Sequence, residues 1–274
     1  MNRFELEGSG TKNILILTGV HGNEITPVYC GYLLINEYGF THNKFKKITI
    51  LNALNTDGIK KNTREIPSDG TNDLNRMFKV EQDEDITTED LEKLFNENDV
   101  IIDIHSSPRC TEFTLINQDE YANSYVRFCR KHEIKYLLRY SDANTIKKYG
   151  LDKNKISFTI EINGLNYIDF ESAKNGVQLV YKIVDNCDKF ELSKEIPKYT
   201  EYFELFTYKS GLFLPYYSVG DEIKEGNLLG KIIDLTTMEE SVIPYNRGLG
   251  WIICTGETQY VSPSQSIYFI QPID

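Results

Sequence analysis

The chain has 274 residues, enough for one large domain or for one domain with a small appendage. Apolar residues make up 40% and charged residues 26% of it, as in ordinary soluble globular proteins, and no apolar stretch is long enough to span a bilayer. The formal net charge of -11 argues against a nucleic-acid or an anionic-membrane partner, because both require a basic face.

Two features at the level of the whole chain indicate its compartment. The N-terminal residues lack the basic start and the apolar core of a signal peptide. The five cysteines are odd in number and show no Cys-x-x-Cys spacing, which argues against a zinc finger and against a disulfide framework. We therefore expect a cytoplasmic protein with reduced, mostly buried thiols.

The first two thirds of the chain alternate short apolar runs with helical stretches. Strands are expected over residues 14–20, 48–54, 100–104, 136–139 and 156–162. A helix is expected to begin at Thr26, with Pro27 in its first turn, and further helices over residues 88–98, 121–132 and 170–190. This alternation predicts a largely parallel sheet with helices on both faces, and ligands of such sheets bind beyond the carboxyl ends of the strands.

The pattern changes after about residue 195. Residues 212–270 form short β-type runs separated by glycines, without helical periodicity, and predict a small all-β domain. Pro197 and mixed charge mark a linker near residues 193–200. We therefore expect two domains, residues 1–195 and 196–274. The acidic run at residues 81–85 is expected to be a solvated loop.

Candidate metal ligands follow two of the expected strands. His21-Gly22-Asn23-Glu24 ends the first apolar run, and His105 ends the run at residues 100–104. Two histidines and a carboxylate form the ligand set of an open zinc site. Each histidine alone is also compatible with a hydrogen-bonded turn or core residue, but their equivalent positions at two strand ends favour a metal. Asp103 lies on the same face as His105 and is a candidate to orient its imidazole; bonding to nearby backbone is the alternative.

Glu161 is the candidate general base. It lies inside the apolar strand 158–162, where an unpaired carboxylate would be costly. A metal-activated water would compensate it, whereas the alternative is a position on the solvent face of an edge strand. Two arginines, Arg64 and Arg76, lie in the polar segment 62–76. Guanidinium groups bind carboxylates and developing oxyanions, although loop arginines alone are unremarkable.

These residues, taken in order, resemble the succinylglutamate desuccinylase/aspartoacylase family of the zinc carboxypeptidase superfamily. The motifs that carry the resemblance are His21-Gly22-Asn23-Glu24, Arg64, Asp73-Leu74-Asn75-Arg76, His105, and Glu161 with Gly164. The resemblance implies a mixed, largely parallel sheet flanked by helices. It also implies one zinc ion per chain, with ligands His21, Glu24 and His105. It further implies roles for four residues: Arg64 polarises the scissile carbonyl and holds its oxyanion, Asn75 and Arg76 bind the substrate's α-carboxylate, and Glu161 activates water and protonates the leaving amine.

The C-terminal part resembles the barrel-sandwich appendage of the same family. Residues 210–215 and 219–230 carry this resemblance, which is shared with biotin and lipoyl carrier domains. Those carriers need a lysine at a hairpin tip, and residues 237–240 offer none, so no attached cofactor is expected. The resemblance implies that the appendage narrows the active-site mouth and contributes a tyrosine. Tyr260 is the candidate substrate-binding tyrosine, with chance proximity as the rival explanation because the chain has 18 tyrosines.

The combined motifs predict a zinc-dependent hydrolase that cleaves the amide of an N-acyl amino acid. The alternative is a zinc carboxypeptidase that removes a C-terminal amino acid from a short peptide with the same residues. A binding protein without activity is a third interpretation, against which the full set of base, oxyanion arginine and carboxylate clamp argues. Lys147 and Lys148 are candidates to meet a dicarboxylic group, although solvent-facing helix lysines are the favoured interpretation. The sequence leaves the acyl group, the amino acid and the oligomeric state open.

Overall fold

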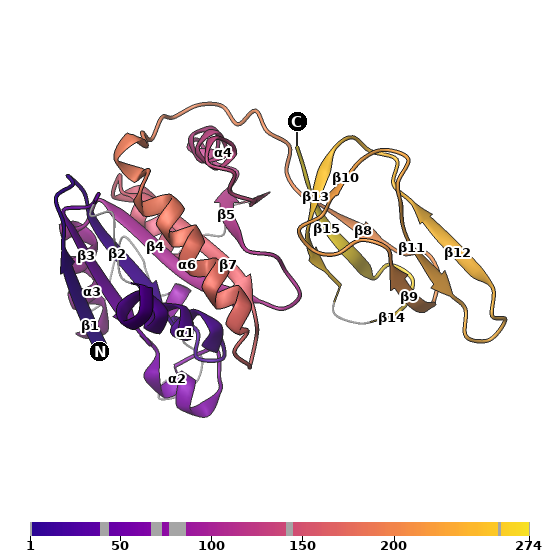
Figure 1. Ribbon diagram of the computed structural model, residues 1–274, viewed down its shortest axis with the longest axis horizontal. Coiled ribbons are helices and arrows are strands. Elements are labelled where there is room, and N and C mark those ends of the chain that lie inside the picture. Colours follow the sequence, from indigo (N-terminus) through magenta and orange to yellow (C-terminus); the bar gives the residue numbers. More distant parts are fainter. Residues whose placement is uncertain are drawn as a thin grey trace.

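The computed structural model describes residues 2–38, 44–66, 73–76, 86–140, 145–256 and 259–273. One large mixed sheet with helices on both faces is followed by two smaller antiparallel sheets (Figure 1). The large sheet has seven strands in the order β1-β3-β2-β4-β7-β5-β6. These are β1 (Asn2–Glu7), β2 (Asn13–Thr18), β3 (Lys47–Asn52), β4 (Val100–Ser107), β5 (Phe113–Asn117), β6 (Tyr136–Arg139) and β7 (Ile156–Asn163). The fold class expected from the sequence is confirmed.

Strand direction follows from the connections. The neighbours β3, β2, β4 and β7 run parallel, whereas β1 is antiparallel to β3 and β5 is antiparallel to β7. Parallel neighbours require crossover connections, which the helices between these strands supply. The carboxyl ends of β2, β4 and β7 therefore meet at one edge of the sheet.

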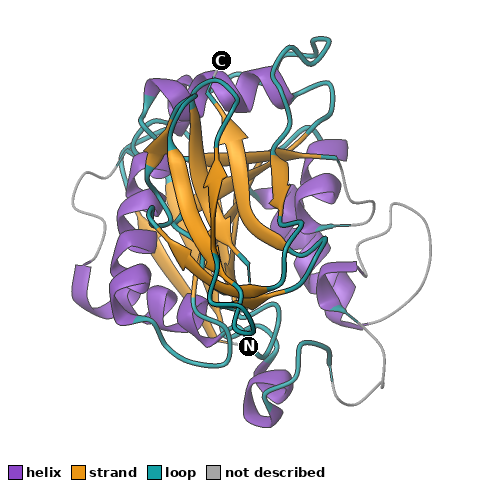
Figure 2. Ribbon diagram, turned by 90° about the vertical axis from the view of Figure 1, so that its right-hand side faces the viewer, coloured by secondary structure: helices purple, strands orange, loops and turns teal. Residues whose placement is uncertain are grey.

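Helices cover both faces of the sheet (Figure 2). The α-helices are α1 (Ile25–Leu33), α2 (Thr56–Lys61), α3 (Ile86–Glu97), α4 (Ala122–Lys131), α5 (Ile146–Asp152) and α6 (Phe170–Val184). Short helical turns are η1 (Leu34–Tyr38), η2 (Leu74–Arg76) and η3 (Cys187–Lys189). Side chains of α1, α4 and α6 share one apolar core with the sheet, and side chains of α3 and α5 share a second core on the opposite face.

Alternation along the strands decides which residues face the second core. In β4, Ile102 and Ile104 belong to the first core, so Asp103 and His105 point to the opposite face. In β7, the residues at 158, 160 and 162 likewise belong to the first core, and Glu161 points to the face of Asp103 and His105. The polar residues inside these apolar strands therefore gather on one side of the sheet.

Most elements expected in this region are present. The expected strand at residues 14–20 ends at Thr18, because Gly19, with a φ of +65°, turns the chain out of the sheet. The expected helix at residues 170–190 ends at Val184 and is followed by η3. The sequence analysis missed β1, α2 and β5, and it implied α5 only through the interpretation of Lys147 and Lys148 as helix lysines. The acidic run at residues 81–85 lies outside the described residues.

The C-terminal strands form two four-stranded antiparallel sheets, in the orders β10-β13-β15-β8 and β12-β11-β9-β14. They are β8 (Phe203–Phe206), β9 (Gly211–Pro215), β10 (Glu222–Ile223), β11 (Leu228–Ile233), β12 (Glu240–Pro244), β13 (Gly250–Thr255), β14 (Tyr260–Val261) and β15 (Ser266–Pro272). The two sheets enclose a separate apolar core. Ile253 of β13 packs against Phe113, Leu115 and Leu137 of the large sheet. Within the described ranges, no helix combines the length and apolarity that crossing a membrane requires.

Candidate metal and substrate site

The turn after β2 positions the first two candidate ligands. A Cβ on Gly22 would lie 2.1 Å from the carbonyl carbon of Gly58 in α2, so only glycine fits where the turn crosses this helix. The Glu24 N–H donates to the His21 carbonyl at 3.3 Å and closes the turn. As a result, the buried side chains of His21 and Glu24 line the same cavity.

Three side chains converge in that cavity, and we call His21, Glu24 and His105 the candidate metal cluster. His21 Nδ1 lies 2.7 Å from Glu24 Oε1, His105 Nδ1 lies 3.0 Å from Glu24 Oε2, and the two ring nitrogens are 3.1 Å apart. Ligands of a tetrahedral zinc ion with bonds of about 2.0–2.1 Å are separated by roughly 3.3 Å. In the described part of the chain, no other group of three His, Cys, Asp or Glu side chains brings its ligand atoms within 4.8 Å of one another.

Hydrogen bonds at the opposite ring nitrogens decide which atoms are available for a cation. His105 Nε2 lies 2.7 Å from Asp103 Oδ2, and His21 Nε2 lies 3.1 Å from Asp73 Oδ1. A carboxylate only accepts, and each ring lies between two of them, so a neutral ring donates either through Nε2 to its outer carboxylate or through Nδ1 to Glu24. Binding of a metal requires the first tautomer, with the proton on Nε2 and the lone pair on Nδ1. Both lone pairs then face each other and the Glu24 carboxylate. Three acceptors at this distance need a cation between them, so the donor set fits a divalent metal.

Carboxylates dominate the electrostatics of the cluster. Burial disfavours the ionised form of Glu24, yet the adjacent His105 and His21 rings lower its pKa well below the usual value. Burial also opposes ionisation of Asp73, whose pKa is nevertheless lowered by its contact with His21. Burial disfavours a charged His105, but Asp103 and Glu24 raise its pKa well above the usual range. The site therefore attracts positive charge, whether a proton or a metal cation.

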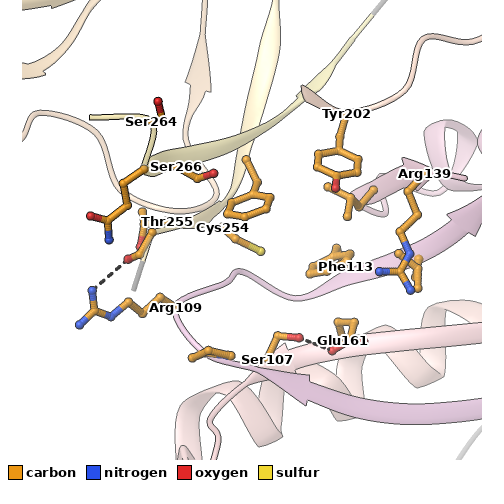
Figure 3. Close-up of a pocket in the computed structure, with 16 residues that line it drawn as sticks. Ser107, Arg109, Phe113, Arg139, Glu161, Tyr202, Cys254, Thr255, Ser264 and Ser266 are labelled. Carbon is orange, nitrogen blue, oxygen red and sulfur yellow. Dashed lines mark hydrogen bonds between the residues drawn. The ribbon is translucent and has the colours of Figure 1, made fainter. Parts of the chain in front are cut away.

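Glu161 lies beside this cluster on the adjacent strand. The register of β4 and β7 places His105 opposite Glu161. The hydroxyl of Ser107 donates to Glu161 Oε2 at 2.7 Å (Figure 3). Burial raises the pKa of Glu161, and the nearby His105 only partly offsets this effect. A carboxyl group with a raised pKa is suited to exchange protons near neutral pH.

Arg64 enters the same cavity, whose volume is about 330 Å³, from the segment after α2. Its guanidinium donates to Asp73 Oδ2 through Nε at 3.2 Å and through Nη2 at 3.0 Å. Its Nη1 atom lies 3.6 Å from Glu24 Oε1. Asp73 therefore contacts both the Arg64 guanidinium and the His21 ring and orients them. Arg64 lies beside Glu24, at the edge of the three candidate metal ligands.

Asn75 and Arg76 of η2 line the same cavity. The backbone N–H of Ile146, at the start of α5, donates to Asn75 Oδ1 at 2.9 Å. This bond turns the Asn75 amide nitrogen toward the site, where it lies 3.3 Å from His105 Nε2. With Arg64, these side chains place amide and guanidinium donors on one side of the metal cluster, as binding of a carboxylate requires.

The favoured interpretation of Lys147 and Lys148 as solvent-facing lysines is wrong for Lys147. Its side chain is 2% exposed, and its amine donates to the Leu115 carbonyl and lies 4.8 Å from the ring centre of Tyr125. Burial lowers the pKa of this amine to about 8. Lys148 is partly exposed and pairs with Asp152. Successive helical residues point about 100° apart, so the packing of α5 on the sheet buries one lysine and exposes the other.

Tyr260 lies apart from the other candidates. It stands in β14, its side chain is 52% exposed, and it is outside the sets of residues that line the two cavities at Glu161. Tyr202, Cys254 and Thr255 of the C-terminal part line a cavity that Glu161 also lines (Figure 3). The sequence pattern carries no signal that would have selected these three residues.

Two contacts inside the site were also missed by the sequence analysis. Asp73 was noted only as part of the Asp-Leu-Asn-Arg motif, although it contacts both His21 and Arg64. Ser107 follows His105 by two residues on the same face of β4, and this spacing was the available signal for its contact with Glu161.

Comparisons with known proteins agree with this geometry. Residues 10–187 match the family model of the succinylglutamate desuccinylase/aspartoacylase catalytic domain, which confirms the resemblance seen in the sequence. A search among curated proteins finds no match. Among solved structures, a succinylglutamate desuccinylase/aspartoacylase from Rhodobacter sphaeroides is 17% identical with a TM-score of 0.67, over 99% of this chain and 89% of its own.

Two further solved structures have the same fold. An aspartoacylase family protein from Mesorhizobium loti is 18% identical with a TM-score of 0.67, over 99% of this chain and 89% of its own. The product-bound ectoine utilization protein EutE (DoeB) from Ruegeria pomeroyi is 15% identical with a TM-score of 0.65, over 98% of this chain and 88% of its own. The similarity thus extends over the C-terminal strands as well as the large sheet.

Proposed function

The chain belongs to the succinylglutamate desuccinylase/aspartoacylase family of deacylase-type hydrolases, and from this premise we propose that it is a zinc-dependent enzyme that cleaves the amide of an N-acyl amino acid. The observation that carries the proposal is the convergence of His21, Glu24 and His105 beside Glu161 in one cavity. Two neutral imidazoles and a carboxylate suit zinc and leave a position for water or substrate.

A zinc ion held by these three residues would polarise the substrate carbonyl and lower the pKa of water. Glu161, next to the cluster, takes a proton from the attacking water and later delivers it to the leaving amine. Its raised pKa matches this double use, because the same carboxyl must accept and then release one proton. Ser107 holds the Glu161 carboxylate in place through its hydroxyl.

Guanidinium and amide groups of the cavity bind the negatively charged groups of the substrate. Arg64, held by Asp73 at the edge of the metal cluster, stabilises the oxyanion that develops on the scissile carbonyl. Asn75 and Arg76 bind the α-carboxylate of the amino acid and thereby orient the amide toward Glu161. We further propose that residues 196–274 are a separate domain that narrows the mouth of the site. Tyr260 lines neither cavity and is not retained as a substrate contact in this proposal.

A metal and substrate assay tests the proposal. Protein stripped by a chelator should lose hydrolysis of N-acetyl-aspartate or N-succinyl-glutamate, and added zinc should restore it. A short peptide in the same panel tests the carboxypeptidase alternative, because both reactions use the same α-carboxylate clamp. Activity that is indifferent to chelator and zinc, or zinc-loaded protein inert on the whole panel, would overturn the assignment.

A further inference from the structure

A second cavity, of about 580 Å³, adjoins the proposed catalytic site. Glu161, Ser107 and Arg139 line both cavities, so the two spaces meet at the proposed base. Figure 3 shows Glu161 and Ser107 on the side of the large sheet and Tyr202 and Cys254 on the side of the C-terminal strands. The second cavity therefore lies between the large sheet and the C-terminal part.

Beyond Ser107, Glu161 and Arg139, the wall that the large sheet gives to this cavity is formed by apolar side chains. Phe113 and Leu115 of β5 point to the site face, and Phe113 is paired in register with Glu161. Leu137 of β6 is paired with Leu115 and continues the same wall. Opposite them, Tyr202 stacks on Phe269 with ring centres 6.0 Å apart. Polar residues also line the cavity: Ser264 and Gln265 from the turn between β14 and β15, and Arg109 from the segment after β4.

The first cavity, at the candidate metal ligands, is lined mainly by polar and charged side chains. Besides the metal cluster and Glu161 it contains Arg64, Asn75, Arg76 and the buried amine of Lys147. A substrate whose carboxylate is bound by these donors has its amino-acid half in the polar cavity. Its amide then lies at Glu161, and its acyl half continues past this residue into the apolar cavity.

We propose that the second cavity is the acyl subsite and that it takes an unbranched apolar acyl group of medium length. This inference rests on the proposed amide hydrolysis. An acetyl group has the bulk of about two water molecules, roughly 60 Å³, whereas a chain of about eight carbons takes roughly 240 Å³. A cavity of about 580 Å³ is far larger than acetyl needs and lies within the range of about 300–1,000 Å³ typical of small-molecule pockets.

A homologous substrate series tests the acyl subsite. The zinc-loaded protein is assayed on N-acetyl-, N-butanoyl-, N-hexanoyl-, N-octanoyl- and N-succinyl-glutamate. Burial of each added methylene should raise kcat/KM by up to about fourfold, so hexanoyl, with four more methylenes, should exceed acetyl by up to roughly 250-fold. Equal kcat/KM along the series, or a preference for succinyl over hexanoyl, would overturn the apolar subsite and leave the hydrolase assignment intact.

A blocking variant and a binding measurement keep the test independent of turnover. Thr255, which lines the cavity, is replaced in Thr255→Trp; Val242, 55% exposed in β12 and outside both cavities, is replaced in the control Val242→Trp. Thr255→Trp should lose the gain from chain length and retain hydrolysis of the acetyl substrate. Calorimetry with octanoate and acetate should detect octanoate binding that Thr255→Trp abolishes and Val242→Trp retains. If octanoate does not bind the wild-type protein, the subsite is refuted even when no substrate is cleaved.

A different observation concerns two cysteines that face each other between the large sheet and the C-terminal strands. Cys110 and Cys254 are partners in an isolated antiparallel bridge. The flanking bonds run from Thr111 N to the Ile253 carbonyl at 3.0 Å and from Thr255 N to the Arg109 carbonyl at 3.0 Å. This pattern defines a non-hydrogen-bonded pair, for which the Cα atoms are about 4.5 Å apart and the side chains point to the same side. That separation lies within the range of disulfides, about 4.4–6.8 Å.

We propose that Cys110 and Cys254 form a reversible disulfide that joins the two parts of the chain. Cys254 lines the second cavity and is the accessible thiol, whereas Cys110 is buried. The thiolate of Cys254 attacks one sulfur of a small disulfide such as oxidised glutathione and releases one glutathione thiolate. The thiolate of Cys110 then attacks Cys254 in the mixed disulfide and releases the second. Two protein thiols are oxidised, one small disulfide is reduced to two thiols, and the two protons pass to the released thiolates.

Mass spectrometry of the whole protein tests this pair. After incubation with oxidised glutathione, the mass should fall by two hydrogen atoms, and a non-reduced digest should contain the peptide of Cys110 linked to that of Cys254. Cys254→Ser should lose the cross-link, and Cys129→Ser, at a cysteine in the first core, should retain it. A stable glutathione adduct at Cys254, or no change in mass, would refute the disulfide.

Discussion

Lys147 offers a direct test of the electrostatics of the buried site. Its amine is buried under α5 and its pKa is lowered from the ordinary value of 10.5 to about 8 because burial disfavours the charged form. Below pH 8 the amine is protonated in the folded and the unfolded states, and the folded protein bears the full cost of the buried charge. Between pH 8 and pH 10.5 the folded state releases the proton while the unfolded chain retains it. The contribution of Lys147 to the free energy of unfolding therefore rises with pH in this window.

The interval between 10.5 and about 8 corresponds to about 3 kcal/mol, since each pH unit is equivalent to roughly 1.4 kcal/mol. Lys147→Met removes the titrating group and preserves most of the side-chain volume. The lost hydrogen bond to the Leu115 carbonyl shifts the stability of the variant by a nearly constant amount. The difference in unfolding free energy between wild type and Lys147→Met should therefore change by about 2–3 kcal/mol in favour of the wild type between pH 7.5 and pH 10.5.

Urea unfolding at pH 7.5, 8.5, 9.5 and 10.5 measures this difference. Buried tyrosines and cysteines also titrate at high pH, but they are common to all variants and cancel in the comparison. Lys148→Met is the matched control, because the neighbouring Lys148 is partly exposed and bonded to Asp152. Its curve should run nearly parallel to that of the wild type. If the unfolding free energy of Lys147→Met also ran parallel to that of the wild type over this pH range, the pKa of Lys147 would not be lowered by burial, and the prediction would be refuted.

Three further predictions concern the site. Glu161→Gln should lower kcat by at least roughly 10²-fold with zinc content unchanged, measured by single-substrate kinetics and metal analysis; near-normal kcat would remove Glu161 as the base. Asp73→Asn should weaken zinc binding by about 10–100-fold, measured by competition with a chelator, because the His21 ring loses its carboxylate partner; unchanged zinc affinity would show that this contact does not support the metal. Gly22→Ala should lower both thermal stability and zinc content, because its Cβ would lie 2.1 Å from a backbone atom of Gly58. A thermal unfolding curve and zinc content equal to those of the wild type would contradict the tight crossing.

Much of the fold was predictable from local pattern. The apolar runs that became β2, β3, β4, β6 and β7 are long enough, and distinct enough from their flanking sequence, to identify a strand directly. The strand β5 was missed because the polar Thr114 and Asn117 interrupt its apolar run, yet all five of its residues are buried by the neighbouring strands and helices. Local pattern thus fails to predict the strands whose residues are buried by segments from distant parts of the chain.

The sequence alone supplied the candidate residues of the site, namely two histidines, two glutamates, two arginines and an asparagine, together with the family. These groups are identified by residue type and order, and alternation along β4 and β7 already places Asp103, His105 and Glu161 on one face. Only the tertiary structure decided that Lys147 is buried while Lys148 is not, that Tyr260 stands outside both cavities, and that an apolar space opens beyond Glu161. The physical reason is that burial and cavity shape depend on which surfaces pack together across long sequence separations, and no local pattern encodes that packing.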